Sequence, residues 1–440
     1  MRQPRFRWLA AFVSLGLIAA ACGGDDDGEA EDSDAETEDG EFEALAFDES
    51  AQCGTDGYVG NLAGIEAVDD LTVRFTLCNP DVAFPSKVAF SALGIFSEEQ
   101  LEATGGAPID DPIGTGPYQL EAWERGSQIV LNAYEDYWGD QASIPTVVFR
   151  WSEESAQRLV ELQSGDVQGI DNVGTEDFEA VSGDDSLQLL EREPLNVFYL
   201  GFNVDKPPLD NETLRQAIGY AIDKDRIIDN FYPEGSIAAD QFLPPGIPQY
   251  EDGAEGYTYD PDRARDLLAE AGHPDGVDLG ALSYRATVRG YLPQPPQVAS
   301  DIRDQLAQVG ITVALDEQEE GAYIDNANAG NLSFYMLGWG ADFPDATNFW
   351  DFHFGEGASP QFGTGFPELH DVLSEAGSTT DEDARNELYN QANEMLKEHA
   401  QALPIAYGGS AVAFKASVDG AHASPLSNEQ FAAMSIEGQD

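Results

Sequence analysis

The sequence predicts an α/β fold in two lobes, and three observations support this prediction. The chain has 440 residues, which is enough for two or three domains with a sizeable core. Helical and strand patterns alternate over residues 248–407, as they do in an α/β lobe. Residues 42–247 are richer in strand patterns, and we expect them to form the other lobe together with residues 408–440.

The strand-rich part shows the two-residue period of β-structure. Residues 71–78 (LTVRFTLC) alternate four apolar side chains with polar ones, which predicts a half-buried strand. Residues 118–133 are two strand-like runs around ERGS and predict a hairpin, and residues 146–151 predict a further strand. Residues 155–165 (SAQRLVELQSG) then predict a helix that ends at Gly165.

The clearest helix signals begin at residue 209. Residues 209–223 repeat apolar side chains with the helical period behind Asp and Asn caps. Asp260 and Pro261 have the residue types of a helix start, and Gly272 ends that helix. Two more helices are predicted at residues 296–310 and 379–400, and strands at residues 311–318, 331–339 and 403–414.

The charge balance excludes nucleic acid as a partner. The chain has 82 Asp and Glu residues against 21 Lys and Arg, a net charge of −61. No basic patch could outweigh such a field. In this background a single carboxylate carries little information about function, whereas an arginine carries more.

The N-terminus predicts a secreted, lipid-anchored protein. Residues 1–21 combine three arginines with an apolar run that is too short to span a bilayer comfortably. The run ends in AAAC and resembles the bacterial lipoprotein signal, in which Cys22 would be lipidated after cleavage; an ordinary secretory signal is the alternative. Residues 22–41 are acidic and predict a disordered tether. We therefore expect an extracytoplasmic protein on the outer face of the cell membrane, in the periplasm or at the cell surface.

Two further cysteines, Cys53 and Cys78, are compatible with a disulfide in a secreted chain. A bridge between them would close a loop of about 25 residues, worth roughly 3–4 kcal/mol in the chain-entropy model. Two separate buried thiols are the alternative. Without nearby histidines, these cysteines do not make a zinc site.

The sequence contains no common enzyme signature. The motifs HExxH, GxSxG and GxxxxGK[ST] are absent, and the five histidines are scattered. We therefore predict a binding protein with no catalytic residue, no metal ligand and no cofactor.

A candidate binding site lies in two loops of the α/β lobe. The stretch GWGADFPDATNF (residues 338–349) follows a buried strand and carries Asp342 and Asp345, and Arg289 lies in a loop between a strand and a helix. Ligands of open α/β sheets bind in such crevices. An Arg pairs with a carboxylate, and an Asp accepts from an ammonium. Arg289 and Asp342 together therefore suit a zwitterion such as a short peptide, whereas Asp345 is expected to cap the turn that follows.

Four longer motifs resemble the peptide-binding branch of bacterial solute-binding proteins that serve ABC importers, the family-5 type. The resemblance covers residues 65–416. Its motifs are PIGTGPYQLEAWERGSQIVLNAYEDYWG, RLVELQSGDV, FYLGFNVDKPPLDNETLRQAIGYAIDKDRII and YTYDPDRARDLLAEAGHPDG.

The resemblance implies a periplasmic-binding-protein-like (class II) fold, in which two lobes joined by a hinge enclose the ligand. The closed form would deliver its ligand to a membrane permease and its ATPase, and nothing covalent would happen to the ligand. We expect a monomer.

The resemblance also implies which residues bind the ligand. Asp342 in WGAD matches the acid that holds the α-ammonium of a peptide, and Arg289 in RGYLP matches the arginine that takes the carboxylate in dipeptide binders. Trp339, Gly340 and Tyr291 would line the pocket.

One departure from the family pattern leaves the ligand open. Family members carry a longer segment before residue 71, so we expect a shortened N-terminal lobe, with pocket size and peptide length undetermined. The same scaffold could bind another solute, namely glutathione, haem, a nickel complex or an oligosaccharide. A secreted hydrolase that uses a pair of carboxylates is the other alternative.

Overall fold

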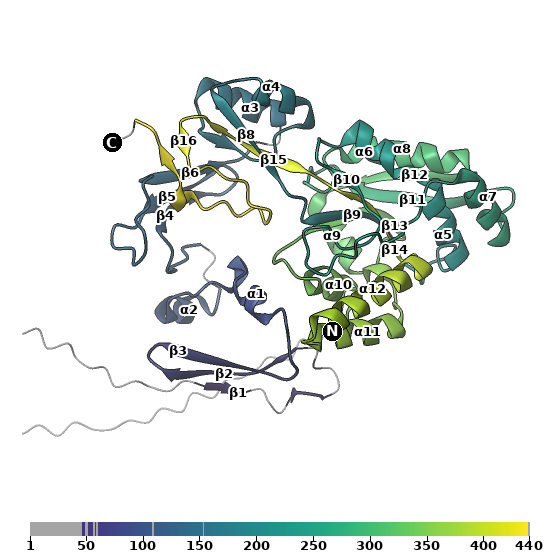
Figure 1. Ribbon diagram of the computed structural model, residues 1–440, viewed down its shortest axis with the longest axis horizontal. Helices are drawn as coiled ribbons and strands as arrows, with labels where there is room; N and C mark the ends of the chain where they lie inside the picture. Colours follow the sequence, from purple (N-terminus) through teal and green to yellow (C-terminus); the bar gives the residue numbers. More distant parts are fainter. Residues whose placement is uncertain are drawn as a thin grey trace, which may run out of the picture.

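The computed structural model describes residues 46–48, 52–55, 58, 60–107, 110–152 and 154–438 (Figure 1). The predicted signal peptide (residues 1–21), Cys22 and the acidic tether (residues 22–41) lie outside these residues. Among the described helices, none has the length and apolar character needed to cross a membrane.

The larger lobe is built on a six-stranded sheet. Its strands are, in spatial order, β10 (Ile237–Ala238), β14 (Ala402–Tyr407), β9 (Asn196–Phe202), β13 (Phe334–Gly340), β11 (Val277–Arg285) and β12 (Ile311–Gln318). β11 runs parallel to β12 and β13, whereas β9 is antiparallel to β13 and β14. The sheet is therefore mixed, and its longest strands, β11 and β12, lie at one side.

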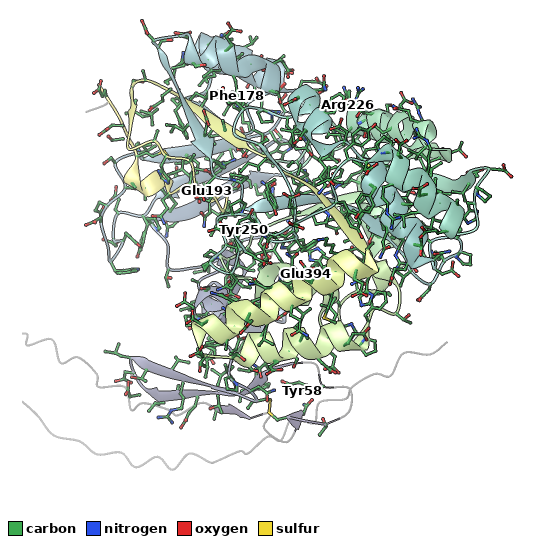
Figure 2. The ribbon with its side chains drawn as sticks, turned by 45° about the vertical axis from the view of Figure 1, so that its right-hand side comes forward. Tyr58, Phe178, Glu193, Arg226, Tyr250 and Glu394 are labelled. Carbon is green, nitrogen blue, oxygen red and sulfur yellow. A yellow bond between two sulfur atoms is a disulfide. The ribbon has the colours of Figure 1, made fainter. Side chains whose placement is uncertain are left out.

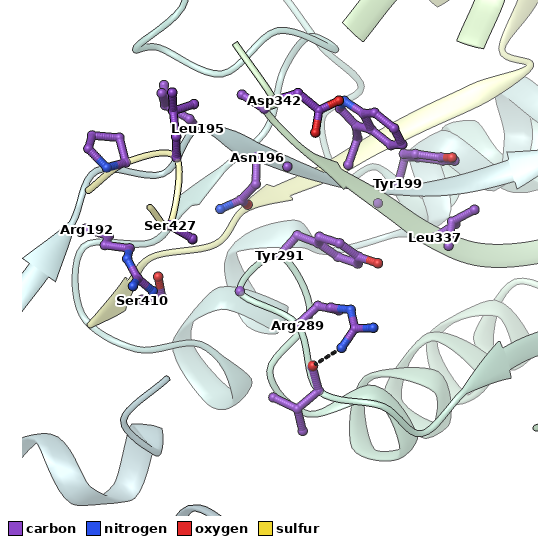
Figure 3. A pocket seen from close by; sticks show the side chains of 18 of the residues that line it. Arg192, Leu195, Asn196, Tyr199, Arg289, Tyr291, Leu337, Asp342, Ser410 and Ser427 are labelled. Atoms are coloured by element: carbon purple, nitrogen blue, oxygen red, sulfur yellow. Dashed lines mark hydrogen bonds between the residues drawn. The ribbon is translucent and has the colours of Figure 1, made fainter. Parts of the chain in front are cut away.

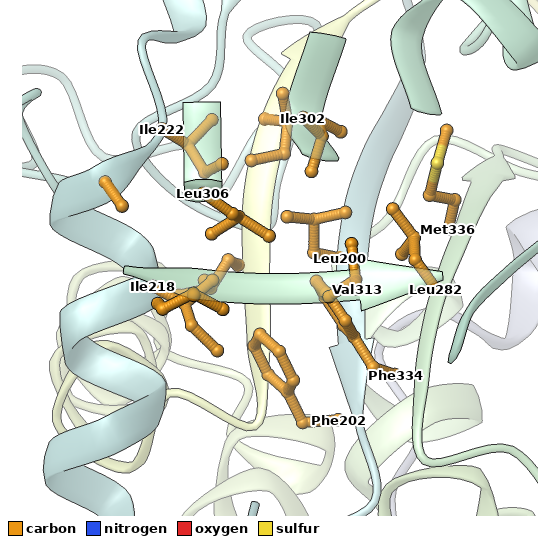
Figure 4. Packing of buried hydrophobic residues seen from close by; sticks show 14 of the residues in the cluster. Leu200, Phe202, Ile218, Ile222, Leu282, Ile302, Leu306, Val313, Phe334 and Met336 are labelled. Atoms are coloured by element: carbon orange, nitrogen blue, oxygen red, sulfur yellow. The ribbon is translucent and has the colours of Figure 1, made fainter. Parts of the chain in front are cut away.

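Helices cover both faces of this sheet, because its central strands are apolar on both sides. In β9, Phe198, Leu200 and Phe202 point into one core, and Val197 and Tyr199 point into the other (Figure 4 shows the first core). The first core is closed by α5 (Glu212–Ala221), α6 (Lys224–Phe231), α7 (Pro261–Glu270) and α8 (Pro295–Gln308). The second is closed by α9 (Glu320–Asn328), α10 (Thr347–Phe354), α11 (Pro367–Ser378) and α12 (Glu382–His399).

The helix signals of the sequence are confirmed where capping is local. The Asp260 carboxylate accepts from the backbone N–H groups of Asp262 and Arg263 at 3.1 and 2.9 Å, and Pro261 is the first residue of α7. At α12 the helix forms, but its cap is Asp381 and not Thr380, which the sequence places in capping-box spacing with Asp383; the Asp381 side chain accepts from the Ala384 N–H at 3.0 Å. Such caps satisfy N–H groups that have no partner within the helix.

The smaller lobe consists of short sheets. One has the order β7 (Gly169–Ile170), β15 (Ser410–Lys415), β8 (Leu187–Arg192), and a second is the meander β4 (Tyr118–Glu124), β5 (Gln128–Ala133), β6 (Thr146–Arg150). The predicted hairpin over residues 118–133 is thereby confirmed. Its other elements are α3 (Ser155–Ser164), α4 (Phe178–Ser182), β16 (Val418–Asp419) and β17 (Ser435–Ile436), with short 3-10 helices at Thr175–Asp177 and Phe431–Ala433. Two further 3-10 helices lie elsewhere: Pro360–Phe362 packs in the second core of the larger lobe, and Ser91–Leu93 belongs to the N-terminal part of the described chain.

The N-terminal part of the described chain forms its own group of elements, at the lower left in Figure 1. It contains β1 (Ala46–Asp48), β2 (Leu62–Asp69), β3 (Thr72–Leu77), α1 (Phe84–Val88) and α2 (Glu98–Thr104). Cys53 and Cys78 form a disulfide with their Cα atoms 5.4 Å apart, in the region of Tyr58 (Figure 2).

The burial predicted for the strand at residues 71–78 is wrong. The strand forms, but Leu71, Val73 and Phe75 keep 96, 58 and 42 % of their surface exposed. The alternation of apolar residues predicts one apolar face, and that face exists. Phe75 meets the Phe84 ring of α1 with the ring centroids 5.3 Å apart, but Leu71 and Val73 stay largely exposed, so the strand is not half-buried.

The chain crosses between the two lobes at residues 193–195 and at residues 408–409. The first crossing joins β8 to β9, and the second joins β14 to β15. The Asn196 side chain ties the crossings together, because it donates to the Gly408 carbonyl at 2.7 Å and accepts from the Gly408 N–H at 2.8 Å. Two adjacent crossings of this kind can serve as a hinge.

These crossings correct two expectations from the sequence. The single strand expected over residues 403–414 is two strands in different sheets, separated by Gly408 and Gly409. We expected the second lobe to begin at residue 248, but β9 and β10 pair with β13 and β14 in its sheet. The sheet of the second lobe therefore begins at Asn196, because the pairing of a strand is decided by distant partners that its own sequence does not specify.

Candidate functional site

A cavity of about 620 Å³ lies between the two lobes. The larger lobe contributes residues of β9, β13 and the loop after β11, and the smaller lobe contributes Asp171, Asn172, Arg192, Ser410 and the turn at residues 425–427. All five residues that the sequence predicted for the ligand line this one cavity: Arg289, Tyr291, Trp339, Gly340 and Asp342. Figure 3 labels Arg289, Tyr291 and Asp342 among them.

Asn348 of α10 orients the end of β13. Its Oδ1 accepts from Trp339 Nε1 at 3.1 Å and from the Asp342 N–H at 2.9 Å, and its Nδ2 donates to Asp342 Oδ2 at 3.2 Å. Because Asn348 is buried, these bonds hold both side chains in place. Sequence reasoning missed Asn348, and its only signal was its place in the ATNF run that follows Asp345.

The Trp339 ring is supported by aromatic neighbours. It stacks on Phe352 with the ring centroids 4.1 Å apart and meets the edge of His353 at 5.2 Å. His353 is buried and its Nδ1 lies 2.7 Å from the Phe349 carbonyl oxygen. Burial lowers the pKa of His353 to about 4, so its imidazole is neutral at pH 7. His353 therefore supports Trp339 as an uncharged ring.

Two arginines, Arg285 at the end of β11 and Arg289 in the loop after it, share one carboxylate. Arg285 donates to Glu320 Oε1 at 2.8 Å and to the Tyr291 hydroxyl at 2.7 Å. Arg289 also donates to Glu320 Oε1, and the Thr287 hydroxyl donates to Glu320 Oε2 at 2.8 Å. Glu320 thus positions Arg289 and, through Arg285, Tyr291. Neither Arg285 nor Glu320 was expected from the sequence.

Gly338 lets the Tyr291 ring lie against β13. A Cβ atom at Gly338 would lie 2.3 Å from Tyr291 Cδ2 and 2.6 Å from the Val197 carbonyl oxygen. At Gly340, two residues further on, a Cβ atom would meet nothing within 4 Å. The close approach of the ring therefore requires glycine at residue 338 and not at residue 340.

This difference gives a prediction about stability. We expect Gly338→Ala to lower the free energy of unfolding by about 1–3 kcal/mol, as overpacking does, and Gly340→Ala to change it by less than about 0.5 kcal/mol. Urea unfolding of both variants measures the difference. Equal stabilities of the two variants would show that the Tyr291 ring can move away at no cost.

A buried arginine, Arg192, supports the part of the cavity wall that the smaller lobe contributes. Arg192 donates to Asp171 Oδ1 and to Glu429 Oε1, both at 2.6 Å, and only 3 % of its side chain is exposed. Two residues of this wall, Asn172 and Ser427, have positive φ angles of 48° and 54°. Residues held in this sparsely populated region are frequent at ligand sites.

Asp345 does not face the cavity. Its carboxylate accepts from Arg385 Nη1 and Nη2 at 3.0 and 2.8 Å and from the Thr347 N–H at 2.9 Å. Burial alone would raise the pKa of Asp345, but the hydrogen bonds from Arg385 and Thr347 outweigh it and lower that pKa. The bond to Thr347 agrees with the capping role expected for Asp345, whereas the pair with Arg385 was not foreseen.

Asp351 of α10 carries a second enclosed carboxyl group, which does not line the cavity. Its Oδ1 is enclosed and, within the described part of the chain, has no hydrogen-bond partner. Burial raises the pKa of Asp351 from 3.8 to about 7. The folded state therefore keeps a proton at Asp351 between about pH 4 and pH 7 that the unfolded state releases, so this group lowers stability as the pH rises through that range.

We therefore expect Asp351→Asn to stabilise the protein at neutral pH. The gain in the free energy of unfolding should be about 1–3 kcal/mol at pH 7 and should disappear near pH 4, where the unfolded chain also begins to protonate Asp351. Urea unfolding of wild type and variant at both pH values measures the gain. A difference that is the same at pH 4 and pH 7 would contradict the assignment.

The described part of the chain contains no candidate metal site. No group of three or more His, Cys, Asp or Glu side chains is placed there to hold a metal ion. The polar groups of the cavity are instead the guanidinium, carboxylate, amide and hydroxyl groups given above.

Known proteins resemble this chain over most of its length. The family model "Bacterial extracellular solute-binding proteins, family 5 Middle" matches residues 33–361. The dipeptide-binding protein of Escherichia coli K12 is 34 % identical over 388 residues, which are 86 % of this chain and 72 % of that protein. Heme-binding protein A of Haemophilus influenzae is 31 % identical over 86 % of this chain and 70 % of its own length.

Solved structures agree with the sequence relatives. The dipeptide binding protein of Pseudoalteromonas sp. SM9913 in complex with Met-Leu superposes with a TM-score of 0.79 at 26 % identity, over 88 % of this chain and 77 % of that one. A periplasmic binding protein of Helicobacter pylori in complex with the peptide STSA gives a TM-score of 0.76 at 28 % identity, over 86 % and 74 %. The predicted two-lobed α/β fold is thereby confirmed, and the chain belongs to family 5 of the bacterial extracellular solute-binding proteins.

Proposed function

We propose that this protein is the substrate-binding component of an ABC importer and that it binds short peptides in the cavity between its lobes. The observation that carries the proposal is that Arg289 and Asp342, which have opposite charges and lie on different loops, line one cavity. The peptide complexes among the structural relatives support the same class of ligand.

The two charged groups have capacity left for a ligand. Asp342 accepts one side-chain hydrogen bond, from Asn348, among the described residues, and a carboxylate has about four acceptor sites. Arg289 donates to Glu320 and to the Val288 carbonyl, and a guanidinium has five N–H donors. The peptide ammonium would bind Asp342, and the peptide carboxylate would bind Arg289.

Ligand binding would close the lobes. The peptide would touch β13 and the loop after β11 on one side and the wall around Arg192 on the other. Contacts to both lobes favour the closed state over the open one, and the two crossings beside Asn196 would absorb the rotation. The closed form would dock on the permease and its ATPase and release the peptide unchanged.

The remaining parts of the proposal concern location. The protein would be held to the outer face of the cell membrane by lipid on Cys22, with residues 22–41 as a tether, and would act as a monomer. Stable anchoring takes more than one acyl chain.

Native mass spectrometry of the purified protein, followed by calorimetry, tests the ligand. We expect micromolar or tighter binding of Ala-Ala, and a loss of binding when either its N-terminus is acetylated or its C-terminus is amidated. Binding of haem, glutathione, a nickel complex or an oligosaccharide with no binding of di- or tripeptides would overturn the proposal.

A further inference from the structure

We propose that Glu320 sets the charge of the peptides that the cavity accepts. This inference rests on the proposed function and adds a specificity to it: the protein prefers peptides whose C-terminal side chain is uncharged over peptides with an acidic side chain there. Glu320 acts through Arg285 and Arg289, so it is a positioning residue and not a ligand-binding one.

Glu320 compensates the charge of two cations, Arg285 and Arg289. Glu320 is the first residue of α9, where the helix N-terminus also favours a negative charge. Its Oε1 accepts from both Arg285 and Arg289, and its Oε2 accepts from Thr287. With one carboxylate shared between two guanidiniums, this wall retains a single net positive charge for the carboxylate of a ligand.

Arg289 is better placed than Arg285 to bind the carboxylate of a ligand. The Arg285 side chain is 11 % exposed and also donates to the Tyr291 hydroxyl, whereas the Arg289 side chain is 42 % exposed. Figure 3 shows Arg289 held at its own loop by the bond to the Val288 carbonyl. Arg289 therefore meets the peptide carboxylate, and Arg285 stays paired with Glu320.

Among the described residues that line the opposite wall, the one cation is already paired. That cation is Arg192, which is bound by Asp171 and Glu429. Of the described residues, no lysine lines the cavity, and Asp342 and Glu193 line it as further carboxylates. The three arginines of the cavity thus stand against five carboxylates that line it or bind these arginines.

A ligand with a second carboxylate would consequently be repelled. Its first carboxylate can pair with Arg289, but its second would enter a cavity in which every other arginine has a carboxylate partner. Removing the charge of Glu320 changes this balance, because Arg285 then loses its anionic partner and becomes available to the second carboxylate.

The test compares Ala-Gln with Ala-Glu, two dipeptides of nearly the same shape that differ by one charge. We expect wild-type protein to bind Ala-Gln about tenfold more tightly than Ala-Glu, and Glu320→Gln to lower this preference by about tenfold, the factor that roughly 1.4 kcal/mol of charge interaction gives. Calorimetry of wild type and of Glu320→Gln with each of the two dipeptides, in the same low-salt buffer, gives the four dissociation constants.

Glu319→Gln is the matched control. It removes the same charge one residue earlier, where the carboxylate caps α9 by accepting from the Ala322 N–H at 3.0 Å and does not line the cavity. We expect it to keep the wild-type preference, so that a general effect of the protein's negative charge is separated from the effect of Glu320.

Three outcomes would overturn the inference, and each of them contradicts a different part of it. If Glu320→Gln keeps the wild-type ratio while wild type binds Ala-Gln, Glu320 does not set the charge and the proposed function stands. If Glu319→Gln lowers the ratio as much as Glu320→Gln, the effect is general electrostatics. If wild type binds neither dipeptide, the proposed function fails and this inference fails with it.

Discussion

Replacing Asp342 by Asn is expected to weaken the binding of Ala-Ala by roughly thirtyfold or more. Loss of one partner of a hydrogen-bonded charge pair that is buried in the complex costs about 2–5 kcal/mol, and about 1.4 kcal/mol is a factor of ten. The substitution keeps the shape of the side chain and an oxygen that can accept from Asn348, which lies 3.2 Å away. The loss therefore reports the charge, and calorimetry of wild type and variant measures it.

Asp325→Asn is the control for Asp342→Asn. Asp325 is an exposed residue of α9 that does not line the cavity, so the same change of charge there should leave the affinity near the wild-type value. Equal losses in the two variants would place the ammonium site elsewhere. A peptide with an acetylated N-terminus should be bound equally poorly by wild type and by Asp342→Asn, since it has no ammonium to lose.

Asp345, the other acid of the same turn, should affect the stability of the fold and not the binding of the peptide. We expect Asp345→Ala to lower the free energy of unfolding by about 3–5 kcal/mol, because it leaves the buried Arg385 without its partner. Only 4 % of the Arg385 side chain and 9 % of the Asp345 side chain are exposed, so water does not replace the lost bonds. Urea unfolding at pH 7 measures the change.

The stabilising effect of Asp345 has a defined pH window. Its pKa is lowered in the folded state from the ordinary value of 3.8, so its contribution is complete above about pH 4 and is lost as the pH falls through the folded pKa. The difference between wild type and Asp345→Ala should therefore be constant from pH 5 to pH 7. Asp325→Ala should change the stability by less than about 0.5 kcal/mol, and a similar small effect of Asp345→Ala would contradict the assignment.

The sequence could predict the features that depend on neighbouring residues. The start of α7 at Asp260 and Pro261 is confirmed, because capping joins groups within three residues of each other. The order of residues around Trp339 and Asp342 also predicted a ligand site at the end of β13, and the cavity between the lobes is lined by that segment. The residues of such motifs are close in the chain, so their order largely decides how they lie relative to one another.

The parts that the sequence could not predict are contacts between distant residues. Arg385 reaches Asp345 across 40 positions, and Arg289 reaches Glu320 across 31. In a chain with 82 acidic residues, nothing in the local sequence distinguishes these two carboxylates from the others. These contacts form only when the fold packs α12 against the turn after β13 and α9 against the loop after β11.

The sequence by itself determined the α/β class, the local helix starts, and the two charged residues, Arg289 and Asp342, that face the cavity. Only the tertiary structure decided that β9 joins the larger sheet, that residues 403–414 divide at Gly408 into two strands, and that Glu320 holds both arginines. The physical reason is that caps and periodicity act over one or two turns of chain, whereas strand pairing and ion pairing depend on which surfaces the whole fold buries together.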